Sequence, residues 1–97
     1  MRIDGIIWKP YFIDKIESKH GVTVYEVEDT LFDSTPRFRF ARRGNVQGED
    51  VYSALGRTEA GRYLVVFFIK KGSSAMPISA RDMTRSERRY YAKVQED

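Results

Sequence analysis

Apolar positions recur at helical spacing after Pro10 and indicate a first helix. They continue to Ile16, and Pro10 itself suits a first helical turn, where its missing N–H has no partner to lose. Gly21 follows a lysine and a histidine, and it can take the left-handed conformation that ends many helices. Before this helix, residues 3–8 are apolar but few, which is consistent with either an edge strand or an extended arm.

A second helix is predicted directly afterwards. Apolar residues lie at i, i+3 and i+7 between Val24 and Leu31, which places them on one helix face. Thr23 and Glu26 have the spacing of a capping box, in which the hydroxyl and the carboxylate each bind a free backbone N–H. The segment 33–36, which ends in proline, is predicted to stop this helix.

From residue 37 onward the pattern is that of strands. Residues 37–40 alternate arginine and phenylalanine, so one face of that strand would be basic and the other aromatic. Residues 63–69 form an unbroken apolar run, which is typical of a central strand covered on both faces. Shorter strands are predicted at residues 50–55 and 75–80, and Pro77 places the last one at an edge or a bulge because proline cannot donate to a ladder.

The end of the chain predicts a capped, arginine-rich helix. Thr84 and Glu87 form a second capping box, with the helix running from about Arg85 to the end. The element order is therefore two helices, an antiparallel meander of about four strands, and a last helix, which is the α+β class. The helices are expected to cover one face of the sheet, leaving Arg37 and Arg39 on the other.

Composition narrows the class of protein. The chain has 97 residues, which argues for a single domain over 1–97, and 41% hydrophobic with 32% charged residues is typical of a globular protein. The absence of cysteine excludes a disulfide scaffold and a thiolate metal site, and a single histidine argues against a His-based metal centre. No pattern suggests a nucleotide cofactor. No apolar run approaches the roughly 20 residues of a membrane span, so a cytoplasmic protein is expected.

The positive charge is unevenly placed. The formal net charge is +3, but arginines gather between positions 37 and 43 and again between 81 and 89. The planar fork of a guanidinium group matches phosphate geometry, so this asymmetry favours an anionic partner for one face. The alternative is a solvated basic surface with no specific partner.

Short motifs in a recognisable order extend over nearly the whole chain. They are Trp8, Lys19-His20-Gly21-Val22, Glu26-Val27, Leu55-Gly56-Arg57-Thr58, Gly61-Arg62, Leu64-Val65-Val66, and Ser79-Ala80-Arg81 followed by Met83-Thr84, Glu87-Arg88 and Tyr91. In this order and spacing they resemble the BrnT family of bacterial type II toxins.

The resemblance implies a fold related to the RelE-like ribonucleases. It also implies a metal-independent endoribonuclease that arrests growth by cutting RNA. An antitoxin with a ribbon-helix-helix DNA-binding half, similar to BrnA, would neutralise it. The complex would repress its own operon, so that the toxin meets DNA only through the antitoxin.

Three positions depart from the family pattern. Lys9 stands where the family often has an aspartate, and Phe12 and Ile16 stand near positions that often hold a lysine and an asparagine. If the family's helix lysine assists cleavage, Lys9 or Lys15 would have to replace it here. A binding module that only pairs with a DNA-binding antitoxin is therefore a second hypothesis. A free-standing RNA-binding protein is a third.

Metal-free RNA cleavage needs a base, an acid, and cations that stabilise the charged phosphorane. Arg81 is the first candidate for charge stabilisation; its alternative role is a structural bridge to Glu87 or Asp82. Arg57, in the predicted hairpin connection, is the second candidate; its alternative is an ordinary solvated turn residue.

Three side chains are candidates for proton transfer, each with a structural alternative. His20 has an unperturbed pKa near neutrality, but Lys-His-Gly is also an ordinary helix ending. Glu87 could act as a base, although its spacing from Thr84 already explains it as a cap. Tyr91 could donate a proton or stack on a base, or it could be buried against the sheet.

A further set of arginines is predicted to contact RNA or the antitoxin, with an exposed helix or strand face as the alternative. The set is Arg37, Arg39, Arg85, Arg88 and Arg89. Phe38 and Phe40 could stack on bases, but they fit better as core residues, with the neighbouring arginines pointing out.

Overall fold

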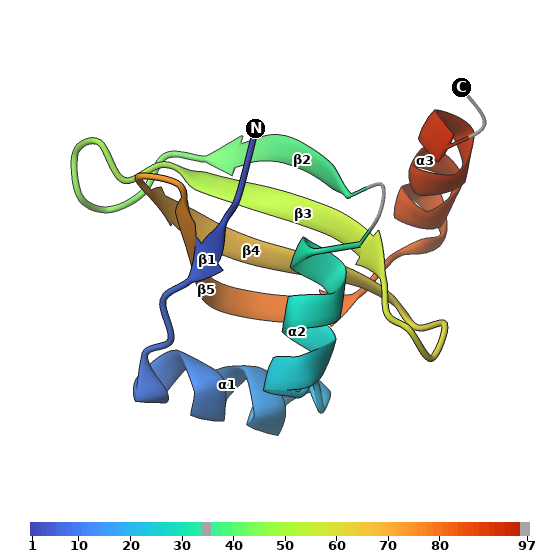
Figure 1. The fold of residues 1–97 in the computed structure, drawn as a ribbon, viewed down its shortest axis with the longest axis horizontal. Helices are drawn as coiled ribbons and strands as arrows, with labels where there is room; N and C mark the ends of the chain where they lie inside the picture. The colour runs from blue at the N-terminus through green and yellow to red at the C-terminus, as the bar shows by residue number, and fades with distance from the viewer. Residues whose placement is uncertain (34–35, 96–97) are drawn as a thin grey trace.

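The computed structural model describes residues 1–33 and 36–95, which form three helices and one five-stranded sheet (Figure 1). The elements in chain order are β1 (Gly5–Ile6), α1 (Pro10–His20), α2 (Val24–Leu31), β2 (Arg37–Arg42), β3 (Val51–Arg57), β4 (Tyr63–Lys71), β5 (Ser74–Asp82) and α3 (Arg85–Gln95). The strand order is β1-β5-β4-β3-β2, with β1 parallel to β5 and all other neighbours antiparallel. The predicted α+β class and the four-strand meander are confirmed.

The predicted helix ends are present. Pro10 lies in the first turn of α1, and Gly21 takes a φ of 61° after its last residue. Thr23 and Glu26 close the capping box of α2, and Thr84 with Glu87 caps α3. Helix α2 ends at Leu31; of the segment predicted to stop it, residues 34–35 lie outside the described residues, as do residues 96–97 after α3.

The segment 3–8 contains an edge strand of two residues, and β5 is longer than predicted. Gly5 and Ile6 pair with Ser74 and Ala75, so this segment is an edge strand rather than an extended arm. Strand β5 continues through Arg81 to Asp82, so Arg81 lies within the strand rather than beyond it. The pairing register shifts between Phe67 and Phe68, opposite Ser79 and Pro77, which is the irregularity that Pro77 predicted.

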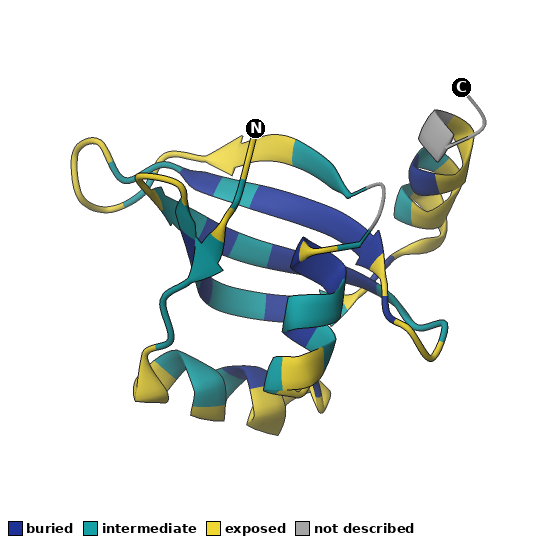
Figure 2. Ribbon diagram, in the orientation of Figure 1, coloured by how far each residue is buried: buried dark blue, intermediate teal, exposed yellow. Residues whose placement is uncertain are grey.

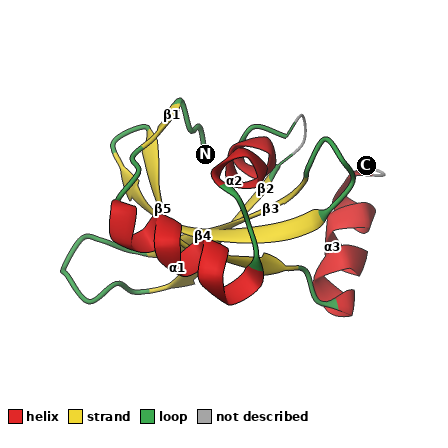
Figure 3. Ribbon diagram, turned by 90° about the horizontal axis from the view of Figure 1, so that it is seen from below, coloured by secondary structure: helices red, strands yellow, loops and turns green. Residues whose placement is uncertain are grey.

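The helices do not all cover one face, and this expectation was wrong. Helix α1 lies along β5, and α2 lies over β3 and β4 (Figures 1 and 3). Their buried side chains pack with Ala54 and Val66. Tyr91 of α3 instead packs with Leu55 and Val65, which point to the opposite face because side chains alternate along a strand. Without α3, these two apolar side chains would face water, which is the physical reason for its placement.

The two phenylalanines of β2 have different environments. Phe38 packs against the core as expected, with its ring edge-on to that of Phe68 and the two ring centroids 6.0 Å apart. Phe40 is 57% exposed, so its assignment to the core was wrong. Strand β2 is one of the two edge strands, and Figure 2 shows that its second half is exposed while β3 and β4 are largely buried. Of the two phenylalanines in this alternating segment, only Phe38 therefore packs on the core.

Gly56 marks the closest approach of α2 to the sheet. A Cβ atom at this position would lie 2.5 Å from the Thr30 carbonyl oxygen and 3.1 Å from the Thr30 Cγ2 atom. Gly56→Ala is therefore expected to lower the free energy of unfolding by about 2 kcal/mol, because α2 would have to move away from the sheet. Urea denaturation of the two proteins measures this change. An unchanged midpoint would mean that α2 does not pack this closely in solution.

Candidate nucleic-acid interface

Two rows of side chains cross the sheet on the side where α3 packs. The pairing registers place Arg37, Leu55, Val65 and Arg81 in one row, and Arg39, Ser53, Phe67 and Ser79 in the next. Arg57 of β3 and Arg88 of α3 lie on the same side, at the Tyr63 ring. We call the surface formed by Arg37, Arg39, Arg57, Arg81 and Arg88 the basic face. Its arginines come from four different elements that only the fold brings together.

Four of these arginines lie against aromatic rings. The distances from the guanidinium carbon to the ring centroid are 4.4 Å for Arg39 on Tyr90, 5.3 Å for Arg81 on Phe67, 5.4 Å for Arg57 on Tyr63, and 4.2 Å for Arg88 on Tyr63. A guanidinium group held against a ring keeps its charge and its N–H edges available for a phosphate. Proteins that bind single-stranded nucleic acids combine cationic groups, which contact the phosphates, with aromatic rings, on which the bases stack.

Arg81 forms the ion pair with Glu87 that was its structural alternative. Its Nη1 and Nη2 atoms donate to the two carboxylate oxygens at 2.6 and 2.9 Å, and Nη1 also reaches the Asp82 carbonyl oxygen at 3.1 Å. The bidentate pair raises the pKa of Arg81 and holds the guanidinium over Phe67. The fork is thus rigidly placed, but any phosphate would share it with Glu87.

Glu87 is ionised over the whole physiological range. The hydrogen bonds from Arg81, which outweigh the opposing effect of burial, together with the backbone N–H of Thr84, lower its pKa to about 2. A carboxylate with so low a pKa is a weak proton acceptor at neutral pH. The geometry gives Glu87 the capping role that its spacing from Thr84 predicted.

This low pKa predicts an acid-dependent loss of stability. The folded-state pKa of Glu87 lies below its ordinary value of 4.5, so the stabilisation is complete above pH 4.5 and is lost as the pH falls toward 2. This stabilisation is on the order of 1–2 kcal/mol, because the ion pair is partly exposed to solvent. Glu87→Gln is expected to be less stable than wild type at pH 7 and nearly equal at pH 2, measured by urea denaturation across this range. Parallel pH profiles for the two proteins would contradict the pairing.

Tyr91 is buried against the sheet, which was the structural alternative to a role in proton transfer or base stacking. It is 2% exposed, its ring meets Tyr63 edge-on at 5.9 Å, and its hydroxyl donates to the Asp33 carboxylate. The same carboxylate accepts the backbone N–H of Arg57 at 3.0 Å. Asp33 therefore joins the end of α2, the end of β3 and helix α3. Sequence reasoning missed this role, because its two partners are 24 and 58 residues away.

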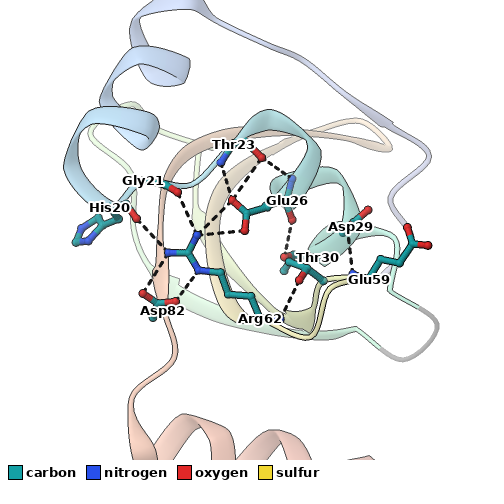
Figure 4. A network of polar contacts seen from close by, with 10 residues as sticks. His20, Gly21, Thr23, Glu26, Asp29, Thr30, Glu59, Arg62 and Asp82 are labelled. Carbon is teal, nitrogen blue, oxygen red and sulfur yellow. Dashed lines mark hydrogen bonds and ion pairs between the residues drawn. The ribbon is translucent and has the colours of Figure 1, made fainter.

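His20 lies at the other side of the sheet, beside a clamp built on Arg62 (Figure 4). Arg62 donates to the carbonyl oxygens of His20 and Gly21 at 3.1 Å, to Glu26 at 3.2 Å, and to Asp82 at 2.8 and 3.2 Å. The imidazole points away from the guanidinium. His20 thus ends α1, as its structural alternative proposed, and Asp82 points away from the side that its neighbour Arg81 faces.

The clamp also shifts the ionisation of its members. Asp82 and Glu26 raise the pKa of Arg62 against the opposing effect of burial. Arg62 in turn lowers the pKa of Asp82. Burial raises the pKa of Glu26, but the Thr23 N–H and Arg62 together outweigh it and leave the pKa lowered. The network is charged at neutral pH and joins the α1–α2 corner to β4 and β5.

Comparison with known proteins agrees with this arrangement. Residues 12–87 match the family described as the ribonuclease toxin, BrnT, of type II toxin–antitoxin systems. The chain belongs to the BrnT family. Among curated proteins, none matches the sequence. Family membership implies an antitoxin partner, which counts against a free-standing RNA-binding protein.

A solved BrnT structure has the same fold. The 1.1 Å crystal structure of the Brucella abortus ribonuclease toxin BrnT has a TM-score of 0.59 to this chain at 20% sequence identity. The match covers 84% of this chain and 97% of that one. The sheet and the helices that carry the basic face therefore belong to an architecture that is already known in the BrnT family.

The positions that depart from the BrnT pattern have different environments. Ile16 is 3% exposed in the core, and Phe12 is half-buried on α1. Lys9 is exposed before α1, where its side chain makes no capping hydrogen bond. Lys15 and Phe12 line a hollow of about 370 Å³ beside β4 and β5. An apolar residue at position 16 thus serves packing rather than chemistry.

The remaining predicted arginines gather on α3. Arg85, Arg88 and Arg89 line an open hollow of about 480 Å³ with Tyr63 and Met83. Arg57 borders a different hollow, of about 400 Å³, whose other side chains are mostly acidic: Glu28, Asp29, Asp33 and Glu59, with Phe32. Arg88 therefore has a more basic setting than Arg57, although both lie at Tyr63.

Residues 1–33 and 36–95 contain no candidate metal site and no candidate membrane-spanning helix. No group of three or more His, Asp or Glu side chains in these segments is placed to hold a metal ion. No helix within them is long and apolar enough to cross a membrane.

Proposed function

We propose that this BrnT-family chain is a metal-independent endoribonuclease toxin that binds and cuts RNA on its basic face. The observation that carries the proposal is the set of four arginines held against aromatic rings on one side of the sheet. Cations placed in advance around a phosphodiester stabilise the charge that develops when the 2′-OH attacks the phosphorus. Arg81 and Arg57 have this role in the proposal, and Arg37, Arg39, Arg85, Arg88 and Arg89 contact the RNA backbone.

Proton transfer is assigned to the remaining candidates. Tyr91 is nearer than His20 to the basic face, because its ring contacts Tyr63, on which Arg57 and Arg88 lie. Its hydroxyl is bonded to Asp33, a carboxylate that can take up a proton. Tyr91→Phe would remove this hydroxyl and its bond to Asp33 but keep the ring packing. Loss of cleavage by a variant that unfolds at the wild-type temperature would support the chemical role.

The partner is proposed to be a BrnA-like antitoxin with a ribbon-helix-helix DNA-binding half, in the cytoplasm. An acidic antitoxin segment would complement the basic face and compete with RNA for it. The toxin would then meet operator DNA only through its antitoxin.

Incubation of the purified protein with total RNA in EDTA tests the activity. Cleaved RNA, protected when the antitoxin is added, is the expected result. Intact RNA in the presence of excess folded protein would rule out the proposed ribonuclease function. Titration of the protein with the same purified antitoxin measures their binding affinity independently of RNA cleavage.

A second candidate function is a binding module that pairs with the antitoxin without cutting RNA. The specific observation behind it is that all three proton-transfer candidates have structural contacts: Glu87 with Arg81, Tyr91 with Asp33, and His20 at the end of α1. This function predicts tight antitoxin binding and intact RNA in the same assay, so the two candidates give opposite results.

A further inference from the structure

We infer that the ring of Phe67 is the floor of a subsite for one unpaired nucleobase of RNA. The inference rests on the proposed function, since it places a nucleotide on the basic face. It adds that the substrate is single-stranded where it binds, and that the protein reads a base as well as the phosphates. The residues of this subsite are Arg39, Ser53, Phe67, Ser79 and Arg81.

The register of the sheet places hydroxyl groups on both sides of the Phe67 ring. Ser53 is the cross-strand neighbour of Phe67 on β3, and Ser79 is its neighbour on β5. Directly opposed residues in a sheet are about 5 Å apart. A base lying flat on the ring would therefore have its polar edges within hydrogen-bonding reach of the two serines.

Ser53 places a hydroxyl group beside the Phe67 ring. Ser53 is 5% exposed, and its hydroxyl makes no hydrogen bond to any residue that the structure describes. The hydroxyl is not among the fully buried polar atoms that lack a partner, so it reaches the solvent-accessible surface and is open to a ligand group beside the aromatic floor. Ser79 is half-buried and likewise makes no side-chain hydrogen bond within the described segments.

Cations lie on two sides of this floor. The Arg81 guanidinium is 5.3 Å from the centre of the Phe67 ring, and Arg39 lies in the same cross-strand row as Phe67, stacked on Tyr90. Among the described residues, Arg39 forms no ion pair, so its charge is available to a phosphate. An aromatic floor between two arginines suits a base with a phosphate on each side. Bases inside a duplex are stacked and cannot lie on the ring.

Binding of 2′-O-methyl RNA, which cannot be cut by attack of its own 2′ oxygen, tests the subsite. Fluorescence anisotropy would compare a 12-nucleotide single strand with the same strand in a duplex. Wild type is expected to bind the single strand at least about tenfold more tightly. Phe67→Leu is expected to weaken single-strand binding about tenfold, which is a typical effect of one lost base stack, and to leave duplex binding unchanged.

The matched control is Tyr25→Leu, which removes an aromatic ring that is 74% exposed and lies on α2, on the opposite side of the sheet from the basic face. It is expected to leave both affinities unchanged. Ser53→Ala, which keeps the volume of the site, is expected to weaken single-strand binding about threefold to tenfold. It keeps the test decisive if Phe67→Leu lowers the midpoint of thermal unfolding.

Equal affinity for single strand and duplex would overturn the subsite, as would unchanged binding by both variants. Its failure can be told apart from failure of the proposed function. RNA cleavage together with binding that does not depend on Phe67 would rule out the subsite but not the ribonuclease function. Phe67-dependent binding without cleavage would rule out the ribonuclease function but support the subsite.

Discussion

Arg81→Ala is expected to abolish growth arrest on induced expression and to slow RNA cleavage by at least about 100-fold. The loss of one well-placed group that stabilises transition-state charge typically has an effect of this size. Arg81 is the best-placed cation on the basic face, because Glu87 holds both of its terminal nitrogens and Phe67 supports its plane. Cleavage rates of the purified proteins on one RNA, together with growth curves, measure the effect.

The substitution also removes a structural contact, so its controls must separate the two roles. Loss of the ion pair is expected to reduce the free energy of unfolding by about 1–2 kcal/mol. Glu87→Gln weakens the same pair but keeps the arginine, and it is expected to retain growth arrest at a similar loss of stability. Arg2→Ala removes an arginine whose side chain is 87% exposed and which has no assigned RNA contact, so it serves as the charge-matched control. Growth arrest by folded Arg81→Ala would rule out the assigned role.

Arg62→Ala is expected to lower the free energy of unfolding by about 3 kcal/mol without any direct loss at the basic face. The side chains of Arg62 and Glu26 are 29% and 26% exposed, so removal of the guanidinium leaves half-buried acceptors without their donor. Here Glu26 would remain beside the α1–α2 corner, and the carbonyl oxygens of His20 and Gly21 would lose their shared donor. For a domain of this size the expected fall in the midpoint of thermal unfolding is more than about 10 °C.

Two further variants locate the source of this effect. Arg62→Lys keeps the charge but cannot bind several acceptors in one plane, so an intermediate loss is expected. Arg2→Ala removes an arginine whose side chain is 87% exposed in its pair with Asp4, and no measurable change is expected. If Arg62→Ala melted with the wild type, the clamp in Figure 4 would not contribute to stability in solution.

Arg62 and Arg81 show that similar residues close in space can have different roles. Strand β5 ends with Arg81 facing the basic face, while Asp82 faces the clamp. Side-chain alternation along the strand separates the two environments. The Arg81 and Arg62 variants should therefore affect different quantities: RNA cleavage for the first, and stability for the second.

Much of the local structure followed from the sequence alone. The capping boxes at Thr23 and Thr84, the left-handed Gly21 and the apolar run of β4 involve residues within a few positions of one another. Their energetics depend on short-range hydrogen bonds and side-chain periodicity, which a single sequence shows directly. The ordered family motifs added the expected fold, and the BrnT match confirmed it.

Only the tertiary structure decided which side chains meet. Arg39 lies on Tyr90, Tyr91 bonds to Asp33, and Arg62 clamps a helix corner about 40 residues away. Either arginine could equally have faced water, because the residues next to it in the sequence do not indicate which distant side chain it will contact. The face that α3 covers depended on the exposed Leu55–Val65 patch, and the Phe67 subsite depended on the register of three strands. The sequence by itself therefore determined the elements and their order, whereas long-range packing decided which face became the basic one.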